Sequence, residues 1–341
     1  MKEETNDNNV NKDKQQPTSS NDNNNNNDIT KELESTLSNL TLNEQPQPPK
    51  SSSSSSSIYD SDKYKTFISH LKNGDFTNII FMTGAGISTS AGIPDFRSKN
   101  GLFRQLQDKY NLSTPEEFFD IKTFLTNPTY FYEFYKQFDS ETYNPTVFHY
   151  FMGFLCYKKY VKMIFTQNID GLEHKCGIDE DKLIFAHGNF DEGHCPNCYK
   201  DIDIKLIRTA AYKDEVYYCP DCDTPCKPKI VFYREDLPKR FYQQSYRLME
   251  SDLGIICGTS LLVAPFNGLP YKMHKYSWRV VINKSPIGEI TGKRAFQYMK
   301  EDSKDLLIKG YSDDVVKRII KDCEWEEEFE KFVSQTKEAN R

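Results

Sequence analysis

Two pairs of cysteines share one spacing, and that spacing is typical of a closed metal site. The pairs are Cys195 with Cys198 and Cys219 with Cys222. Each Cys-x-x-Cys turn can place two thiolates on one face of a tetrahedron, and the second turn completes the coordination. We therefore predict a zinc ribbon that holds one structural Zn²⁺. Cys226 and His194 lie close by as rival ligands, but the symmetric spacing favours the four, and Cys226 is interpreted as a spare thiol.

A glycine turn lies upstream of the cysteines, directly after a short apolar run at 77–83. Gly84 and Gly86 allow the backbone to approach a phosphate closely and to take a positive φ. The turn departs from a dehydrogenase fingerprint, because Thr89 stands where a third glycine is expected. The acidic residue near the expected offset, Asp108, lies in a polar, helix-like stretch and not at a strand end. Taken alone, the turn fits a dinucleotide site or a simple tight turn.

Six short apolar runs predict the strands that must position these residues. The runs are 77–83, 161–166, 183–186, 253–257, 279–283 and 306–308. Helical patterns lie between several of them, for example at Val315–Trp325. Buried strands that alternate with helices predict an α/β protein with a Rossmann-like, doubly wound parallel sheet.

Two inserts interrupt this alternation, and we predict that they form a smaller module of a helical insert and a zinc ribbon. Residues 98–145 contain aromatic-rich helical stretches, and residues 190–230 contain the cysteine pairs. The folded domain is predicted to span 58–335, with a short polar tail at 336–341. Residues 1–57 are mostly Asn, Ser, Gln, Pro and Lys, which cannot bury enough apolar surface to offset chain entropy, so this arm is predicted to be disordered. One short helical pattern occurs within it, at Ile29–Leu42.

The composition argues against several classes of protein. A net charge of −6 disfavours direct binding to nucleic acid. The sequence contains no apolar run of about 18 residues, so no membrane span is expected. The polar N-terminal segment lacks the apolar core of a secretion signal. The nine cysteines fit an intracellular zinc protein better than a disulfide scaffold. We therefore expect an intracellular protein, in the cytoplasm, the nucleus or both.

Five ordered motifs resemble those of the sirtuins, the NAD-dependent protein-lysine deacylases, over roughly residues 60–330. The motifs are Gly84–Ser98, Thr166–Asp170, His187–Gly188, Gly258–Leu261 and Asn283–Lys284. The amino-acid sequences of these motifs are most similar to those of the class that contains the cytosolic tubulin and histone deacetylases. The resemblance implies an enzyme in which the acetyl oxygen of a modified lysine attacks C1′ of the NAD ribose and releases nicotinamide. The implied products are the free lysine and O-acetyl-ADP-ribose.

The resemblance also implies roles for individual residues. Asn168 and Asp170 would bind the nicotinamide carboxamide, and Phe96 would exclude water. His187 would be the general base that helps a ribose hydroxyl attack. The full set of implied cofactor-binding residues is Gly84, Ala85, Gly86, Ile87, Ser88, Thr89, Ile93, Asp95, Phe96, Arg97, Gln167, Asn168, Ile169, Asp170, Gly258, Thr259, Ser260, Asn283, Lys284, Ser285 and Ser312.

The substrate peptide is expected to enter between the segments 231–235 and 263–266 and to add a strand there. Val231 and Phe232 would line a tunnel for the acyl-lysine, whose apolar walls suit an acetyl group. Val263 and Phe266 belong to the facing segment. The implied partners are acetylated lysines of proteins such as histone tails or tubulin.

The chain departs from the family pattern at three places. Asn189 follows the His-Gly pair, where Ser or Thr is usual. The segment that usually reads Lys-Pro-Asp-x-Val-Phe-Phe-Gly-Glu reads Lys-Pro-Lys-Ile-Val-Phe-Tyr-Arg-Glu at 227–235, which introduces Lys229 and Arg234. The adenine-side turn, which often holds a cysteine, reads Gly-Tyr-Ser-Asp at 310–313. We expect these changes to act on peptide preference, with Arg234 narrowing the groove or favouring acidic flanks.

Two other functions fit the same sequence. One is protein mono-ADP-ribosyl transfer from the same NAD site. The other is a non-enzymatic zinc-ribbon adaptor, against which the intact His187, Asn168 and Asp170 argue. Formation of O-acetyl-ADP-ribose would separate the deacetylase from both.

Overall fold

The computed structural model describes residues 57–97, 101–137, 143–287 and 295–340. The predicted arm, except its last residue, and the helical pattern at Ile29–Leu42 lie outside the described residues. At the other end, the last helix, α11 (Glu326–Ala339), continues into the predicted polar tail and buries Thr336. No helix within the described ranges is long and apolar enough to cross a membrane.

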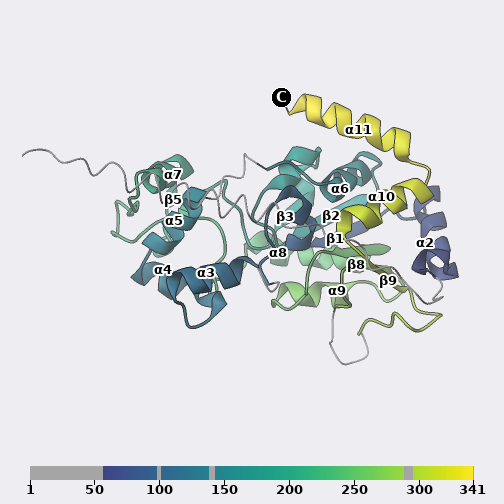
Figure 1. Cartoon of the computed structure of the whole chain (residues 1–341), viewed down its shortest axis with the longest axis horizontal. Coiled ribbons are helices and arrows are strands. Elements are labelled where there is room, and N and C mark those ends of the chain that lie inside the picture. Colours follow the sequence, from purple (N-terminus) through teal and green to yellow (C-terminus); the bar gives the residue numbers. More distant parts are fainter. Residues whose placement is uncertain (1–56, 98–100, 138–142, 288–294, 341) are drawn as a thin grey trace, which may run out of the picture. The chain divides into compact units, whose positions relative to one another are not determined.

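Six parallel strands form the central sheet, in the order β3-β2-β1-β7-β8-β9 (Figure 1). They are β1 (Ile79–Thr83), β2 (Val161–Thr166), β3 (Leu183–Phe185), β7 (Leu253–Cys257), β8 (Trp278–Asn283) and β9 (Asp305–Lys309). The order reverses direction between β1 and β7, as it does in doubly wound dinucleotide-binding sheets. All six strands coincide with the predicted apolar runs to within two residues at either end. The predicted doubly wound sheet is confirmed.

Successive residues of each strand face opposite sides of the sheet, so the apolar runs supply two hydrophobic cores. In β1, Ile79 and Phe81 enter one core, whereas Ile80 and Met82 enter the other. A strand that is buried on both faces needs apolar residues at every position, which is why these strands appear as continuous runs and not as alternating patterns. All five residues of β1 are buried, and so are all five of β7.

Helices cover both faces of the sheet. The first core is closed by α2 (Asp62–Asn73), α6 (Val147–Tyr157), α10 (Ser312–Asp322) and α11. The second is closed by α8 (Lys239–Gln244), the 3₁₀ helices η7 (Ser245–Glu250) and η8 (Phe266–Gly268), and α9 (Leu269–Lys272). The helix α10 confirms the pattern predicted at Val315–Trp325, but it begins at Ser312 and ends at Asp322.

The two inserts form one smaller module with a shared core, as predicted. The first contains α3 (Leu102–Tyr110), η4 (Pro115–Phe119), α4 (Ile121–Thr126) and α5 (Thr129–Gln137). The second contains α7 (Ile204–Tyr212) and a small antiparallel sheet of β4 (Gly193–His194), β5 (Asp201–Ile202) and β6 (Lys227–Pro228). Aromatic side chains of the first insert, such as Phe119 and Phe131, pack in one cluster with Cys195 and Ile207 of the second. Figure 1 shows these helices gathered at one end, away from the six-stranded sheet.

Candidate active site

The loops that follow β1 and β7 meet at the carboxyl edge of the sheet, where the strand order reverses. Gly84 N donates a hydrogen bond to the carbonyl of Cys257, and Gly86 N donates to the carbonyl of Gly258 at 2.8 Å. A Cβ atom at Gly86 would lie 2.6 Å from the Cα of Gly258, and Gly258 itself has φ 65°. Any larger residue at either position would push the loops apart. The glycines are thus required by this backbone contact, which brings two strand ends together in one crevice.

A cavity of about 1170 Å³ opens at this crevice and extends to the smaller module. Most of the predicted cofactor-binding residues line it, from the glycine loop and from the segments that follow β2, β7, β8 and β9. They are Gly84, Ala85, Gly86, Thr89, Asp95, Phe96, Arg97, Gln167, Asn168, Ile169, Gly258, Thr259, Ser260, Asn283, Lys284, Ser285 and Ser312. His187 lines the same cavity, as do Val231, Phe232 and Val263 of the predicted peptide segments.

One end of the cavity contains a buried chain of hydrogen bonds. Ser88 Oγ donates to Asp170 Oδ2 at 2.7 Å, and Asn168 Nδ2 donates to Ser88 Oγ at 3.1 Å. The backbone N–H of Leu172 donates to Asp170 Oδ1 at 3.1 Å. Asn168 Oδ1 is buried and has no hydrogen-bond partner among the described residues. Ser88 therefore fixes the orientation of the Asn168 amide. The side-chain oxygen of Asn168 is left as a hydrogen-bond acceptor that a bound ligand could satisfy.

Behind Asp170 lie two further buried titratable groups, His149 and Glu173. One ligand-type atom from each of the three lies within 4.8 Å of the others. Neither carboxylate oxygen of Glu173 nor Nε2 of His149 has a hydrogen-bond partner within the described part of the chain. Burial, and secondly the charge of Asp170, raise the pKa of Glu173 above its ordinary range, and burial lowers the pKa of His149 to about 3. Both oxygens of Asp170 already accept hydrogen bonds, so the group is better suited to sharing a proton than to holding a metal.

His187 follows β3 and stands at the wall of the cavity. Its Nδ1 lies 3.1 Å from the carbonyl oxygen of Gln167. Because a carbonyl can only accept, Nδ1 carries the proton in this contact and Nε2 keeps its lone pair. Burial lowers the pKa of His187 to about 4, and the hydrogen bond to Gln167 opposes that shift. The imidazole is thus neutral at physiological pH and is held in the tautomer that can accept a proton.

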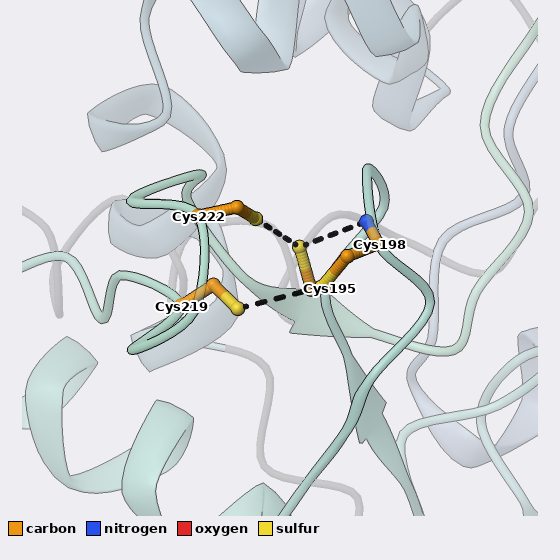
Figure 2. Close-up of side chains that lie close together, drawn as sticks. All are labelled: Cys195, Cys198, Cys219 and Cys222. Carbon is orange, nitrogen blue, oxygen red and sulfur yellow. Dashed lines mark hydrogen bonds between the residues drawn. The ribbon is translucent and has the colours of Figure 1, made fainter.

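The four predicted zinc ligands converge in the smaller module (Figure 2). Cys195 Sγ lies 3.5 Å from Cys222 Sγ, and Cys198 Sγ lies 3.6 Å from Cys219 Sγ. A tetrahedral zinc with Zn–S bonds of about 2.3 Å keeps its sulfur atoms about 3.8 Å apart, so the four residues fit the ion.

Two matching turns build this cysteine cluster. In the first, Cys195 N donates to the carbonyl of Lys200 at 2.9 Å, and in the second, Cys219 N donates to the carbonyl of Thr224 at 2.8 Å. Each turn contains one residue with positive φ, Tyr199 and Asp223 respectively. Cys226 is not part of the cluster, and neither is His194, which agrees with the ranking from spacing. All nine cysteines are free thiols.

Comparison with known proteins decides the family. The sequence model of the family described as 'Sir2 family' matches residues 84–265, which is more than half of the chain. The NAD-dependent protein deacetylase hst2 of Schizosaccharomyces pombe is 38% identical over 283 residues, which are 82% of this chain and 82% of that protein. The chain belongs to the Sir2 family.

Two other sirtuins are longer than the part they share with this chain. The NAD-dependent deacetylase sir2A of Dictyostelium discoideum is 40% identical over 270 residues, which are 77% of this chain and 52% of that protein. The NAD-dependent protein deacetylase sirtuin-2 of Danio rerio is 40% identical over 224 residues, which are 64% of this chain and 59% of that protein. The chain thus spans between half and two thirds of the length of these two relatives.

The sirtuin cavity has the features that a dinucleotide requires. The contact between Gly86 and Gly258 leaves backbone, not side chains, at the edge of β1 and β7, where phosphates can approach. The unsatisfied Oδ1 of Asn168 matches the amide donor of a nicotinamide carboxamide. At the other end, Asn283 Nδ2 donates to the carbonyls of Thr259 and Ser285, at 3.4 and 3.2 Å. The residues present therefore fit NAD.

Five of the residues predicted to bind NAD or the peptide do not line the sirtuin cavity. They are Ile87, Ser88, Ile93, Asp170 and Phe266, all of which are buried. Asp170 and Ser88 act on the cavity through Asn168, as described above. Phe266 lies beneath His187, with the two ring centroids 6.4 Å apart. Direct ligand contacts for these five stay a prediction. In the structure, Ser88 and Phe266 lie behind residues that line the cavity and contact them, and Asp170 contacts Ser88.

The departures from the sirtuin pattern differ in where they lie. Lys229 pairs with Glu192 and Asp201, and Asn189 Nδ2 donates to Asp191, so neither of these two lines the cavity. Arg234 does line it, and its guanidinium pairs with Asp120 of the helical insert. The altered turn at 310–313 also contributes to the wall, through Gly310, Tyr311 and Ser312.

Several wall residues were missed from the sequence. Phe103, Glu116 and Phe119 come from the helical insert, and Tyr233 lies next to the predicted tunnel residues. No spacing rule relates the insert to the glycine loop, because the contact depends on how the smaller module packs. Tyr311 belongs to the altered turn at 310–313 but was not among the predicted cofactor-binding residues. The Nζ of Lys284 lies 4.4 Å from the centroid of its ring. The neighbour of Tyr311 in the sequence, the predicted cofactor-binding residue Ser312, was the signal that could have identified it.

Proposed function

We propose that this chain is an NAD-dependent protein deacetylase that removes acetyl groups from lysine side chains. The observation that carries the proposal is the position of His187, a neutral imidazole on the same cavity wall as Asn168 and the glycine loop. Family membership and the names of the relatives agree with it.

When bound, NAD would supply an anomeric carbon that the acetyl oxygen attacks as the bond to nicotinamide breaks. The residues of the chain act around that carbon. Asn168 would orient the carboxamide through its unsatisfied Oδ1, and Ser88 and Asp170 would hold Asn168 in place. Phe96 packs edge to face on Phe103, with centroids 5.3 Å apart, and would exclude water from that end.

The Nε2 nitrogen of His187 would accept a proton from a ribose hydroxyl. Its tautomer is fixed by Gln167, and its neutral state is favoured by burial, so the base is ready without any change of protonation. Backbone N–H of Val231 donates to the carbonyl of His187 at 2.7 Å, which joins the base directly to the peptide segment.

The acetyl-lysine would reach the cavity along Val231 and Phe232, opposite Val263. Phe232 is buried among aromatic rings of the helical insert, including Phe124 and Phe131 at 5.5 and 5.2 Å between centroids. The amides of Val231, Phe232 and Tyr233 already donate within the protein. The carbonyls of Phe232 and Tyr233 already accept from Glu235 N and Ile121 N, so a substrate strand would pair on this side with the carbonyl of Val231. Acetylated histone-tail and tubulin peptides are the first substrates to test.

The test is a product assay with purified full-length protein, NAD and an acetyl-lysine peptide, analysed by mass spectrometry. We expect deacetylated peptide and O-acetyl-ADP-ribose in equal amounts, and no product from the His187→Ala variant, which should still bind NAD. Label transferred from NAD to protein, without O-acetyl-ADP-ribose, would replace the proposal by mono-ADP-ribosyl transfer. Absence of both products from zinc-loaded, folded protein would leave a non-enzymatic role.

A further inference from the structure

A side-chain hydrogen bond to the hydroxyl of Tyr233 connects the peptide segment to the cofactor loop. Arg97 belongs to the loop that begins at Gly84, and Tyr233 belongs to the segment that carries Val231 and Phe232. The NH2 nitrogen of Arg97 donates to the Tyr233 hydroxyl at 3.0 Å. Both side chains line the cavity. Tyr233 stands where the usual family pattern given above has phenylalanine, which has no hydroxyl to accept this hydrogen bond.

The guanidinium of Arg97 also contacts two residues of the helical insert. Its NH1 nitrogen donates to Glu116 Oε1 at 3.1 Å, and its guanidinium lies 5.2 Å from the centroid of Phe103. The neighbouring Phe96 packs on the same Phe103. The insert therefore holds this end of the loop from one side, and Tyr233 is the contact that comes from the peptide segment.

Tyr233 is in turn fixed by its own backbone. Its N–H donates to the carbonyl of Phe119 at 2.7 Å, and its carbonyl accepts from Ile121 N at 3.4 Å. Two residues earlier, the backbone N–H of Val231 donates a hydrogen bond to the carbonyl of His187. Burial raises the pKa of Tyr233 above 10, with the positive charge of Arg97 opposing the shift, so the phenol is neutral and accepts at physiological pH. A shift of this segment on peptide binding would reach Arg97 through one hydrogen bond.

We propose that Tyr233 is a positioning residue that couples occupancy of the peptide groove to occupancy of the dinucleotide site. The inference rests on the function proposed above. If the bond between Tyr233 and Arg97 is stronger when both ligands are bound, each ligand raises the affinity for the other by the same factor. The charged donor makes this bond stronger than one between neutral groups, and the partial exposure of Arg97 moderates it.

The conservative variant Tyr233→Phe tests the coupling, because it removes only the hydroxyl. The readout is the affinity of an uncleavable carbocyclic NAD analogue, measured by calorimetry with and without saturating acetyl-lysine peptide. In the unaltered protein the peptide should tighten the analogue. In Tyr233→Phe that factor should fall by about three- to tenfold, which is less than a buried charge-assisted hydrogen bond contributes, because Arg97 is partly exposed. Affinity for the analogue alone should change much less.

Two further variants separate coupling from a general structural effect. Tyr110→Phe removes a hydroxyl that donates to Glu133 at 2.8 Å, in the same helical insert but away from the cavity, and should leave the coupling factor unchanged. In an Arg97→Ala background, Tyr233→Phe should have no additional effect. Zinc content and thermal midpoint are measured for every variant.

An unchanged coupling factor in a folded Tyr233→Phe protein would overturn the inference, and so would an unaltered protein without coupling. Product formation is assayed on the same samples. A protein that couples the two ligands but yields no deacetylated peptide would contradict the proposed function and leave the inference on coupling standing. A protein that deacetylates without coupling would do the reverse.

Discussion

At His187, a backbone carbonyl decides which ring nitrogen can act. The carbonyl of Gln167 accepts a hydrogen bond from Nδ1–H, so the lone pair on Nε2 is the one available for chemistry. His187 follows β3 and Gln167 follows β2, and these two strands are neighbours in the sheet. The parallel pairing of β2 and β3 therefore fixes the tautomer of the base.

The lowered pKa of His187 predicts an unusual pH profile. A general base must be neutral, so activity falls only as pH drops through the folded-state pKa, which is about 4. We expect kcat/KM to stay flat from pH 8 down to about pH 5.5, below the range in which an ordinary histidine titrates. Steady-state rates in a series of overlapping buffers would measure this. An acid limb centred near pH 6.5 or above would contradict it.

The buried carboxyl of Glu173 predicts a pH-dependent cost to stability. Its pKa is raised in the folded protein, so the folded state binds more protons than the unfolded state above the ordinary carboxyl range. Stability contributed by this group is full at low pH and is lost as pH rises. Glu173→Gln removes the titration while keeping the shape.

We therefore expect Glu173→Gln to gain stability relative to the unaltered protein as pH rises from about 5 to about 8. Urea unfolding at several pH values measures the difference in unfolding free energy. Asp170, His149 and His174 face the same carboxyl and are retained in both proteins. The exposed Glu215→Gln is the matched control and should show no such trend. A difference that is constant with pH would contradict a proton-binding role.

At the scale of elements, the segment 227–235 is held by an internal ion pair. Lys227 is fully buried, and its Nζ donates to the carbonyl of Ile230 at 2.6 Å and to Glu235 Oε2 at 2.9 Å. Glu235 Oε2 also accepts from Phe232 N at 2.7 Å. Burial lowers the pKa of Lys227, and Glu235 opposes that shift. The pair closes the turn that presents Phe232 to the cavity.

Removing one partner of this pair should be costly. Lys227→Met keeps the length and apolar stem of the side chain but leaves Glu235 without its cation. We expect a loss of about 3 kcal/mol in the free energy of unfolding, at the lower end for a broken buried pair because Glu235 is partly exposed. Urea denaturation measures the loss, and KM for the peptide should rise. The surface variant Lys200→Met, which breaks an exposed pair with Asp221, should lose less than about 1 kcal/mol.

The same scale separates the elements that could be predicted from those that could not. The strands β2 and β7 match their predicted runs residue for residue, because double burial demands an unbroken apolar stretch. The helix α7 and the two-residue strands β4, β5 and β6 were not predicted. Strands this short have no period of their own, and they form where the zinc ligands and the aromatic core hold the chain.

At the scale of the whole molecule, the sheet and the smaller module have separate cores that depend on different forces. The sheet buries apolar runs on both faces. The module packs an aromatic cluster against Cys195 and Cys219, so its core continues directly into the metal site. Its only extended sheet within the described residues is made of two-residue strands.

Removal of zinc should therefore unfold the module before the sheet. We expect a strong chelator to abolish activity and near-ultraviolet signal from the aromatic cluster, with much of the far-ultraviolet signal of the α/β sheet retained. Circular dichroism and activity, followed by addition of Zn²⁺ under reducing conditions, measure loss and recovery. Full activity in metal-free protein would contradict a structural ion.

Features that depend on neighbouring residues could be predicted from the amino-acid order alone. Apolar runs predicted the sheet, paired cysteines predicted the metal cluster, and contiguous motifs identified the family, since strand burial, ligand spacing and loop backbone each act over a few residues. Contacts between distant side chains emerged only from the folded structure. The contact of Tyr233 with Arg97, the ion pair of Arg234 with Asp120 and the buried group around Glu173 each join segments whose separation no spacing rule specifies. Such contacts follow from packing, which the whole chain determines together.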